Sequence, residues 1–172
     1  MMNDLNKKTI EEKFRYLLDS CLYRSFLNGG SDAGQRVRFE YDFSDGLNCV
    51  QGSVDFGPLA EGPPQHVHGG CISSVLDQTM GAAVFLKGIF AMTAEMQVTY
   101  KRPIPINSRQ SFFAKVESQD GRKFYTTSQL TDTQGQVFAL GRGIFVQVPK
   151  EKLGLSDAKL IETVEALFQV EK

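Results

Sequence analysis

The sequence lacks the features that mark several classes of protein. Its 172 residues contain 19 Lys and Arg against 20 Asp and Glu, and the net charge of −1 gives no support for binding nucleic acid or an anionic membrane. No apolar run approaches the roughly 20 residues that a membrane-spanning helix requires. The P-loop and the glycine-rich dinucleotide-binding motif do not occur either. We therefore expect a globular protein with no nucleic-acid partner and no membrane span.

Cysteine and histidine are also scarce. The three cysteines, Cys21, Cys49 and Cys71, are an odd number without CxxC spacing, which favours reduced thiols in an intracellular protein. The two histidines, His66 and His68, have no third ligand at a recognisable spacing, so no metal site is predicted. The first residues are too charged for a signal peptide, and the cytoplasm is the expected compartment.

Periodic hydrophobic residues divide the chain into three parts. Residues 1–34 carry a capping box followed by apolar residues at helical spacing, which predicts an amphipathic helix and a linker. Residues 35–149 predict two strands, a central helix and four further strands, and residues 150–172 predict a C-terminal helix. Hairpin-length links between the last four strands predict an antiparallel meander. We expect an α+β fold, one structural domain overall, in which a six-stranded antiparallel sheet wraps around the central helix.

The segment from Gly62 to Lys87, GPPQHVHGGCISSVLDQTMGAAVFLK, is the centre of this arrangement. Gly69 and Gly70 stand where the helix begins, and free N–H groups there would suit a thioester or carboxyl oxygen. The backbone needs of a helix start explain two glycines equally well. Asp77 is the one acid of the helix and is a candidate general base or nucleophile. A structural Asp bonded to a neighbouring Ser or backbone group fits the sequence as well.

The spacing of these residues bears on how a site could form. Gly70 and Asp77 are seven residues apart, which separates them by roughly 10 Å along one helix axis. A carbonyl held at Gly70 would be too far from Asp77 of the same helix. A two-fold dimer with antiparallel central helices would bring the glycines of one chain near the Asp of the other. We therefore infer that any such site lies across a subunit interface.

Other candidates have both a functional and a structural explanation. Cys71 at the helix start could be a nucleophile, but its place on the apolar side of the helix favours packing. His68 is expected to orient the loop before the glycines by hydrogen bonding. The basic pairs at 101–102 and 122–123 could bind a phosphorylated carrier or be merely solvated.

Thr93 begins a strand of nine alternating residues. Its alternation places Thr93 on the polar face of that strand, together with Glu95 and Gln97. From there its hydroxyl could lie beside Asp77 or could simply cap the strand.

Several motifs follow one another in a recognisable order. They are PxHVHGG at 64–70, Asp77, Gly81, TA at 93–94, VxYKRPIP at 98–105 and GRKF at 121–124. This set resembles the hotdog-fold acyl-coenzyme A thioesterases, in particular the branch called thioesterase superfamily members, and the resemblance covers roughly Val50 to Val148. It implies a hotdog fold and hydrolysis of an acyl-CoA thioester to free acid and CoA, with neither metal nor redox cofactor.

The resemblance also implies roles for individual residues. Asp77 matches the family's catalytic acid, acting as general base or nucleophile. Gly69 and Gly70 match the helix start whose amide polarises the carbonyl, with His68 beside it. Thr93 matches a hydroxyl that positions the water or the acid. The positions that match the CoA-contacting region are Thr99, Lys101, Arg122, Lys123 and Phe124.

The resemblance further implies a homodimer whose sheets join edge to edge, often as a dimer of dimers. This agrees with the site at a subunit interface that the helix spacing predicts. Two alternatives stay open: a non-catalytic protein that binds or senses acyl-CoA, and a hotdog enoyl-CoA hydratase or dehydratase. The acyl group, fatty or aromatic, is not fixed, and the apolar residues that could line its tunnel are Met80, Phe85, Phe90 and Met96.

Overall fold

A computed structural model describes residues 12, 26–27, 34–42 and 49–149. The predicted N-terminal and C-terminal helices lie outside these residues. Within them, the chain forms a six-stranded sheet, one α-helix and a short 3-10 helix. Their bounds are β1 Val37–Asp42, β2 Val50–Phe56, η1 Pro58–Ala60, α3 Gly69–Phe85, β3 Ala91–Tyr100, β4 Ser108–Asp120, β5 Lys123–Thr131 and β6 Val137–Gln147.

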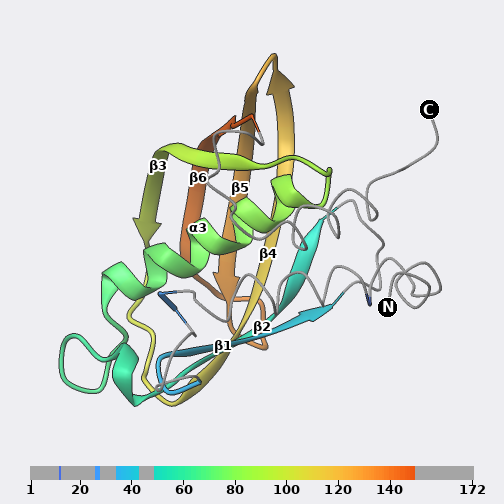
Figure 1. Ribbon diagram of the computed structural model, residues 1–172. Helices are drawn as coiled ribbons and strands as arrows, with labels where there is room; N and C mark the ends of the chain where they lie inside the picture. Colours follow the sequence, from blue (N-terminus) through green and yellow to red (C-terminus); the bar gives the residue numbers. More distant parts are fainter. Residues whose placement is uncertain (1–11, 13–25, 28–33, 43–48, 150–172) are drawn as a thin grey trace.

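The strands pair antiparallel throughout, in the order β1-β2-β4-β5-β6-β3. The expected six-stranded antiparallel sheet around one helix is therefore confirmed, as Figure 1 shows. The predicted meander is wrong for β3, which pairs with β6 instead of β4. The link at 101–107 contains Pro103 and Pro105 and carries the chain away from β3, because proline cannot donate to a strand ladder.

α3 covers one face of the sheet and packs against β3, β4, β5 and β6 (Figure 1). At 100° per residue, one side of α3 and its C-cap consists of residues that are all buried: Cys71, Ile72, Val75, Leu76, Thr79, Ala82, Ala83 and Leu86. Met80 and Val84 are buried as well. The Thr79 hydroxyl lies 2.8 Å from the Ser128 hydroxyl of β5, so this buried polar pair is satisfied. The prediction of a packing side on the central helix is confirmed.

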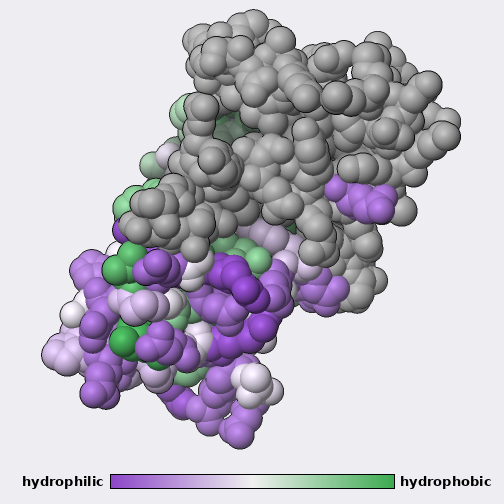
Figure 2. Space-filling model, turned by 60° about the horizontal axis from the view of Figure 1, so that its bottom comes forward, coloured by the Kyte–Doolittle hydropathy of each residue, from purple (hydrophilic) through white to green (hydrophobic). Residues whose placement is uncertain are grey.

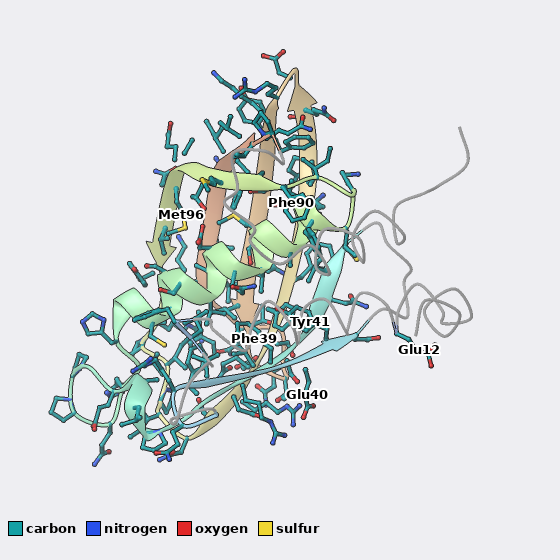
Figure 3. The ribbon with its side chains drawn as sticks, in the orientation of Figure 1. Glu12, Phe39, Glu40, Tyr41, Phe90 and Met96 are labelled. Atoms are coloured by element: carbon teal, nitrogen blue, oxygen red, sulfur yellow. The ribbon has the colours of Figure 1, made fainter. Side chains whose placement is uncertain are left out.

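The side chains of β1 alternate between two faces of the sheet. Figure 3 shows Phe39 and Tyr41 on one side of this strand and Glu40 on the other. The rings of Phe39 and Tyr41 stack with centroids 5.7 Å apart, and both meet the edge of Phe112 on β4. On the opposite face, Glu40 pairs with Arg38 and Arg109. The period of two thus separates an aromatic core face from a charged outer face.

β3 is a long edge strand. Among the described residues its hydrogen-bonded neighbour is β6 alone, and most of its side chains are exposed or half-buried. Met92 is 56% and Tyr100 51% exposed, which is high for large apolar side chains. Such an edge offers a row of N–H and C=O groups to another strand. In the view of Figure 2, the described part of the surface is mostly hydrophilic. No helix in the described part of the chain is long and apolar enough to cross a membrane.

Candidate active site at the central helix

A hydrogen bond joins the acid of α3 to the start of β3. The Thr93 hydroxyl donates to Asp77 Oδ1 at 2.6 Å, and the Asp77 side chain is half-buried. Asp77 Oδ2 has no hydrogen-bond partner among the described residues. One carboxylate oxygen is thereby fixed, and the other is left available to a water or to a carbonyl carbon.

The face on which Thr93 lies differs from the prediction. Thr93 pairs with the buried Phe145 and therefore faces α3, whereas Glu95 pairs with Ile144 and faces the opposite side of the sheet. The cause is a β-bulge at Ala94, where one extra residue reverses the alternation. Glu95 lines a cavity on the outer face together with Gln97, Tyr125, Thr127 and Arg142. The bulge is what turns the Thr93 hydroxyl toward Asp77.

The start of α3 is capped by His68. Its Nδ1 accepts a hydrogen bond from the Gly70 N–H at 2.9 Å, and its predicted role in orienting the loop before the glycines stays a prediction. The expectation that both glycine amides are free is wrong, because the Gly70 N–H is occupied. The Gly69 N–H has no partner in the part of the chain that the structure describes. Gly69 therefore supplies the open donor at the helix start.

The loop before the helix fixes His68 in this place. Its N–H bonds Ala60 O at 2.8 Å, and the neighbouring Val67 N–H bonds Ile104 O at 2.8 Å. Gly62 allows the loop to fold closely over the histidine, since a Cβ there would lie 2.7 Å from His68 Cα. These contacts within the loop hold His68 in its capping position without a bound ligand.

Two residues at the helix start were missed by sequence reasoning. The Tyr100 hydroxyl donates to Gly69 O at 3.0 Å, and the Ser73 hydroxyl donates to the same oxygen at 3.0 Å. Tyr100 ends β3 on its helix-facing side, since it pairs with the buried Ala139. The alternation of Met96, Val98 and Tyr100 in the sequence is the signal that could have placed this hydroxyl near the helix.

Asp77 and Gly69 cannot act on one carbonyl within a single chain. Gly69 is the first residue of α3 and Asp77 lies eight positions later, about 12 Å along the axis at 1.5 Å per residue. A carbonyl oxygen and its carbon are about 1.2 Å apart, so the acid and the donor must each reach almost the same point. The described chain therefore contains two half-sites.

Cys71 is a packing residue. It is buried beside the helix start, and burial raises the pKa of its thiol to about 11. A thiol with a raised pKa stays protonated at neutral pH and is a poor nucleophile.

We expect Cys71 of the folded protein to resist iodoacetamide at pH 8, and to react once the protein is unfolded and the thiol pKa returns toward its ordinary value. Peptide mapping by mass spectrometry measures this, with the half-buried Cys49 as the internal comparison. Alkylation of Cys71 in the folded protein at the rate of an unfolded thiol would contradict its assignment as a packing residue.

The residues matched to CoA contacts lie at two ends of the sheet. The Lys101 N–H bonds Phe138 O at one end of β6, whereas Lys123 pairs with Val146 at the other. The eight residue-to-residue steps along β6 from Phe138 to Val146 span about 26 Å. Thr99 shares the Lys101 end, so one chain does not bring all these residues together.

Phe124 differs from its neighbours in this set. Lys123 and Arg122 are exposed at the β4–β5 turn, but Phe124 is fully buried with 0% exposure. Its ring packs in the core between sheet and helix, so it offers no surface to a ligand. The alternation of β5 explains this, because residues 124, 126, 128 and 130 all point to the core.

No group of three or more His, Cys, Asp and Glu side chains that could hold a metal ion occurs among the described residues. His66 Nδ1 lies 2.9 Å from Pro64 O, within the loop.

Residues 64–139 match the family model described as thioesterase superfamily. This match covers 76 of the 172 residues of the chain. The matched segment contains the His68 cap, the open Gly69 N–H, the Asp77–Thr93 pair and the β4–β5 turn. The six-stranded sheet of the described chain, with its one central helix, is the hotdog fold.

The chain also has relatives of known name and of known structure. Over 75 residues it is 48% identical to acyl-coenzyme A thioesterase THEM4 of Xenopus laevis, covering 43% of this chain and 33% of that protein. The chain spans 33–40% of the length of the curated relatives it matches.

Two crystal structures extend the comparison. One is of a thioesterase superfamily protein, with 37% identity and a TM-score of 0.54 over 58% of this chain and 49% of that one. The other is of a Bacillus halodurans protein with CoA, with 22% identity and a TM-score of 0.61 over 81% and 91% of the two chains. The second likeness concerns the fold alone.

Proposed function

We propose that the protein hydrolyses the thioester of a fatty or aromatic acyl-CoA to a free acid and CoA. The observation that carries this proposal is the Thr93 hydrogen bond to Asp77 Oδ1 inside the segment that matches the thioesterase superfamily model. It orients a half-buried carboxylate with one free oxygen. The name of the Xenopus laevis relative, acyl-coenzyme A thioesterase THEM4, agrees with the substrate class.

The chemistry follows from the two half-sites. The Gly69 N–H donates to the thioester oxygen and stabilises the negative charge that develops on it. Asp77 Oδ2 either takes a proton from water as that water attacks the carbonyl carbon, or attacks the carbon itself and forms an anhydride that water then cleaves. Both routes consume one water and release the CoA thiol, and neither requires a metal or redox cofactor.

The two half-sites would combine in a homodimer. A two-fold axis near the middle of β3 would pair this exposed edge with its copy in antiparallel orientation. The Thr93 end of one strand would then lie beside the Tyr100 end of the other. Because Asp77 bonds Thr93 and Gly69 lies against Tyr100, the acid of one chain would face the open N–H of its partner. We further propose that two such dimers associate to form a tetramer.

The same pairing would gather the basic residues. The Gln147 N–H bonds Arg122 O, and Gln147 pairs with Ala91, so Arg122 and Lys123 lie at the end of the sheet where β3 begins. The Lys101 of a second chain would reach that same end. Together these side chains would provide the positive charge that the CoA phosphates require.

Release of a free thiol tests the proposed function. Purified protein incubated with acyl-CoAs should release CoA, measured with a thiol-reactive dye. Binding of acyl-CoA without thiol release would favour the binding or sensing alternative, and a change in enoyl-CoA absorbance would favour a hydratase.

The same assay across acyl chain lengths, with an aromatic acyl-CoA included, would define the acyl group. Met80 is fully buried in the core, so it is not a candidate for lining the acyl site. Phe85 and Phe90 are half-buried with ring centroids 5.5 Å apart, and they stay candidates.

A further inference from the structure

We propose that Tyr100 is a positioning residue that holds the Gly69 N–H in its productive direction, a role that rests on the proposed thioesterase function. Its hydroxyl bonds Gly69 O at 3.0 Å and also lies within hydrogen-bond distance of the Ser73 hydroxyl. Tyr100 is the last residue of the exposed edge strand, yet its hydroxyl reaches the first residue of α3.

The helix start needs such an anchor because it consists of two consecutive glycines, whose backbone has more freedom than that of other residues. The peptide between Gly69 and Gly70 is held on both sides. Its carbonyl oxygen accepts from Tyr100 and Ser73, and its N–H donates to His68 Nδ1 at 2.9 Å. With this peptide fixed, the Gly69 N–H on its other side has a defined direction.

The ring of Tyr100 adds a steric contact to the hydrogen bond. A Cβ placed on Gly69 would lie 3.5 Å from both Cζ and Oη of Tyr100, so the ring lies directly against the glycine. Tyr100 therefore contacts Gly69 through both its ring and its hydroxyl.

This contact links the edge strand to the oxyanion donor. In the proposed dimer, β3 would pair with its copy, and this pairing would restrict the motion of the strand. Because Tyr100 at the end of β3 bonds Gly69 O, the helix start would be held more firmly as well. The donor would then be most firmly held when the second chain, which supplies Asp77, is in place.

Replacing Tyr100 with Phe removes the hydroxyl and keeps the ring. We expect kcat to fall about tenfold with little change in KM, because a hydrogen bond that orients a transition-state donor is lost. Ser73 still bonds the carbonyl in this variant, so Tyr100→Phe combined with Ser73→Ala should lose more activity than either change alone. Tyr125→Phe is the matched control, since Tyr125 lines the cavity on the outer face of the sheet, and it should keep wild-type kcat.

A double-mutant cycle separates positioning from general damage. If Tyr100 acts through the Gly69 N–H, Tyr100→Phe should cost little further activity when Gly69→Pro has already removed that N–H. An equal loss in both backgrounds would show a merely structural role. Unchanged kcat in Tyr100→Phe and in the Tyr100/Ser73 double variant, with an active wild type, would overturn the inference and leave the proposed function standing. A wild type without thiol release would overturn both.

Discussion

Replacing Asp77 with Asn should lower kcat for thiol release by roughly 10²- to 10⁴-fold, the range for loss of a positioned proton-transfer group. The Asn carbonyl can still accept the Thr93 hydrogen bond that Asp77 Oδ1 accepts at 2.6 Å. The other oxygen becomes an NH₂ group, which donates hydrogen bonds and cannot take a proton or attack a carbonyl. The fold should therefore survive while the chemistry is lost. Initial rates with saturating acyl-CoA measure the effect.

The control for this variant removes a carboxylate from elsewhere in the sheet. Asp55 is partly exposed on the outer face, where it faces Arg38 and Arg109 at 3.7 Å. Asp55→Asn changes the net charge by the same amount, and an exposed pair of this kind contributes little to stability. We expect near-wild-type turnover. Full activity of Asp77→Asn, or equal losses in both variants, would refute the role of Asp77.

Replacing Gly69 with Pro should lower kcat by roughly 10²- to 10³-fold, the usual cost of losing one oxyanion donor. Gly69 is the first residue of α3, a position that tolerates proline because its N–H takes no part in the helix ladder. The preceding His68 has φ −61° and ψ 134°, the extended conformation that a residue before proline prefers. The substitution therefore removes one N–H without breaking the helix.

Gly69→Ala is the matched variant, because it adds a side chain at the same position and keeps the N–H. Its Cβ would make an ordinary contact with the Tyr100 ring at 3.5 Å. We expect it to lose much less activity than Gly69→Pro, and circular dichroism should show the helix intact in both. Equal losses in the two variants would mean that steric change at Gly69, and not its N–H, limits turnover.

The part of the fold that could be predicted from the sequence is the part in which the spacing of hydrophobic residues indicates which side chains are buried. The alternation of β1 and the apolar side of α3 both follow from local patterns in the sequence. The partner of β3 depends on the path of the 101–107 link, which alternation does not encode. Sequence order favoured β4 as the neighbour, whereas the chain pairs β3 with β6.

The candidate site was predictable in its residue types but not in its detailed geometry. Asp77 stood out as a single acid on the helix, and the glycines marked the helix start. The bulge at Ala94 leaves no sequence signal and reverses the face on which Thr93 lies. The Gly70 N–H is occupied and the Gly69 N–H is open because the His68 side chain turns back so that its Nδ1 reaches Gly70. The loop sets this side-chain conformation, and the local sequence pattern does not show it.

The claim that matters most is that each site combines Asp77 of one chain with Gly69 of another. Co-expression of an Asp77→Asn chain and a Gly69→Pro chain, each with its own affinity tag, yields mixed dimers. One of their two sites would contain both substitutions and the other neither. We predict about half the wild-type turnover per mixed dimer, far above either homodimer. Mixed dimers no more active than the two homodimers would contradict a site shared between chains.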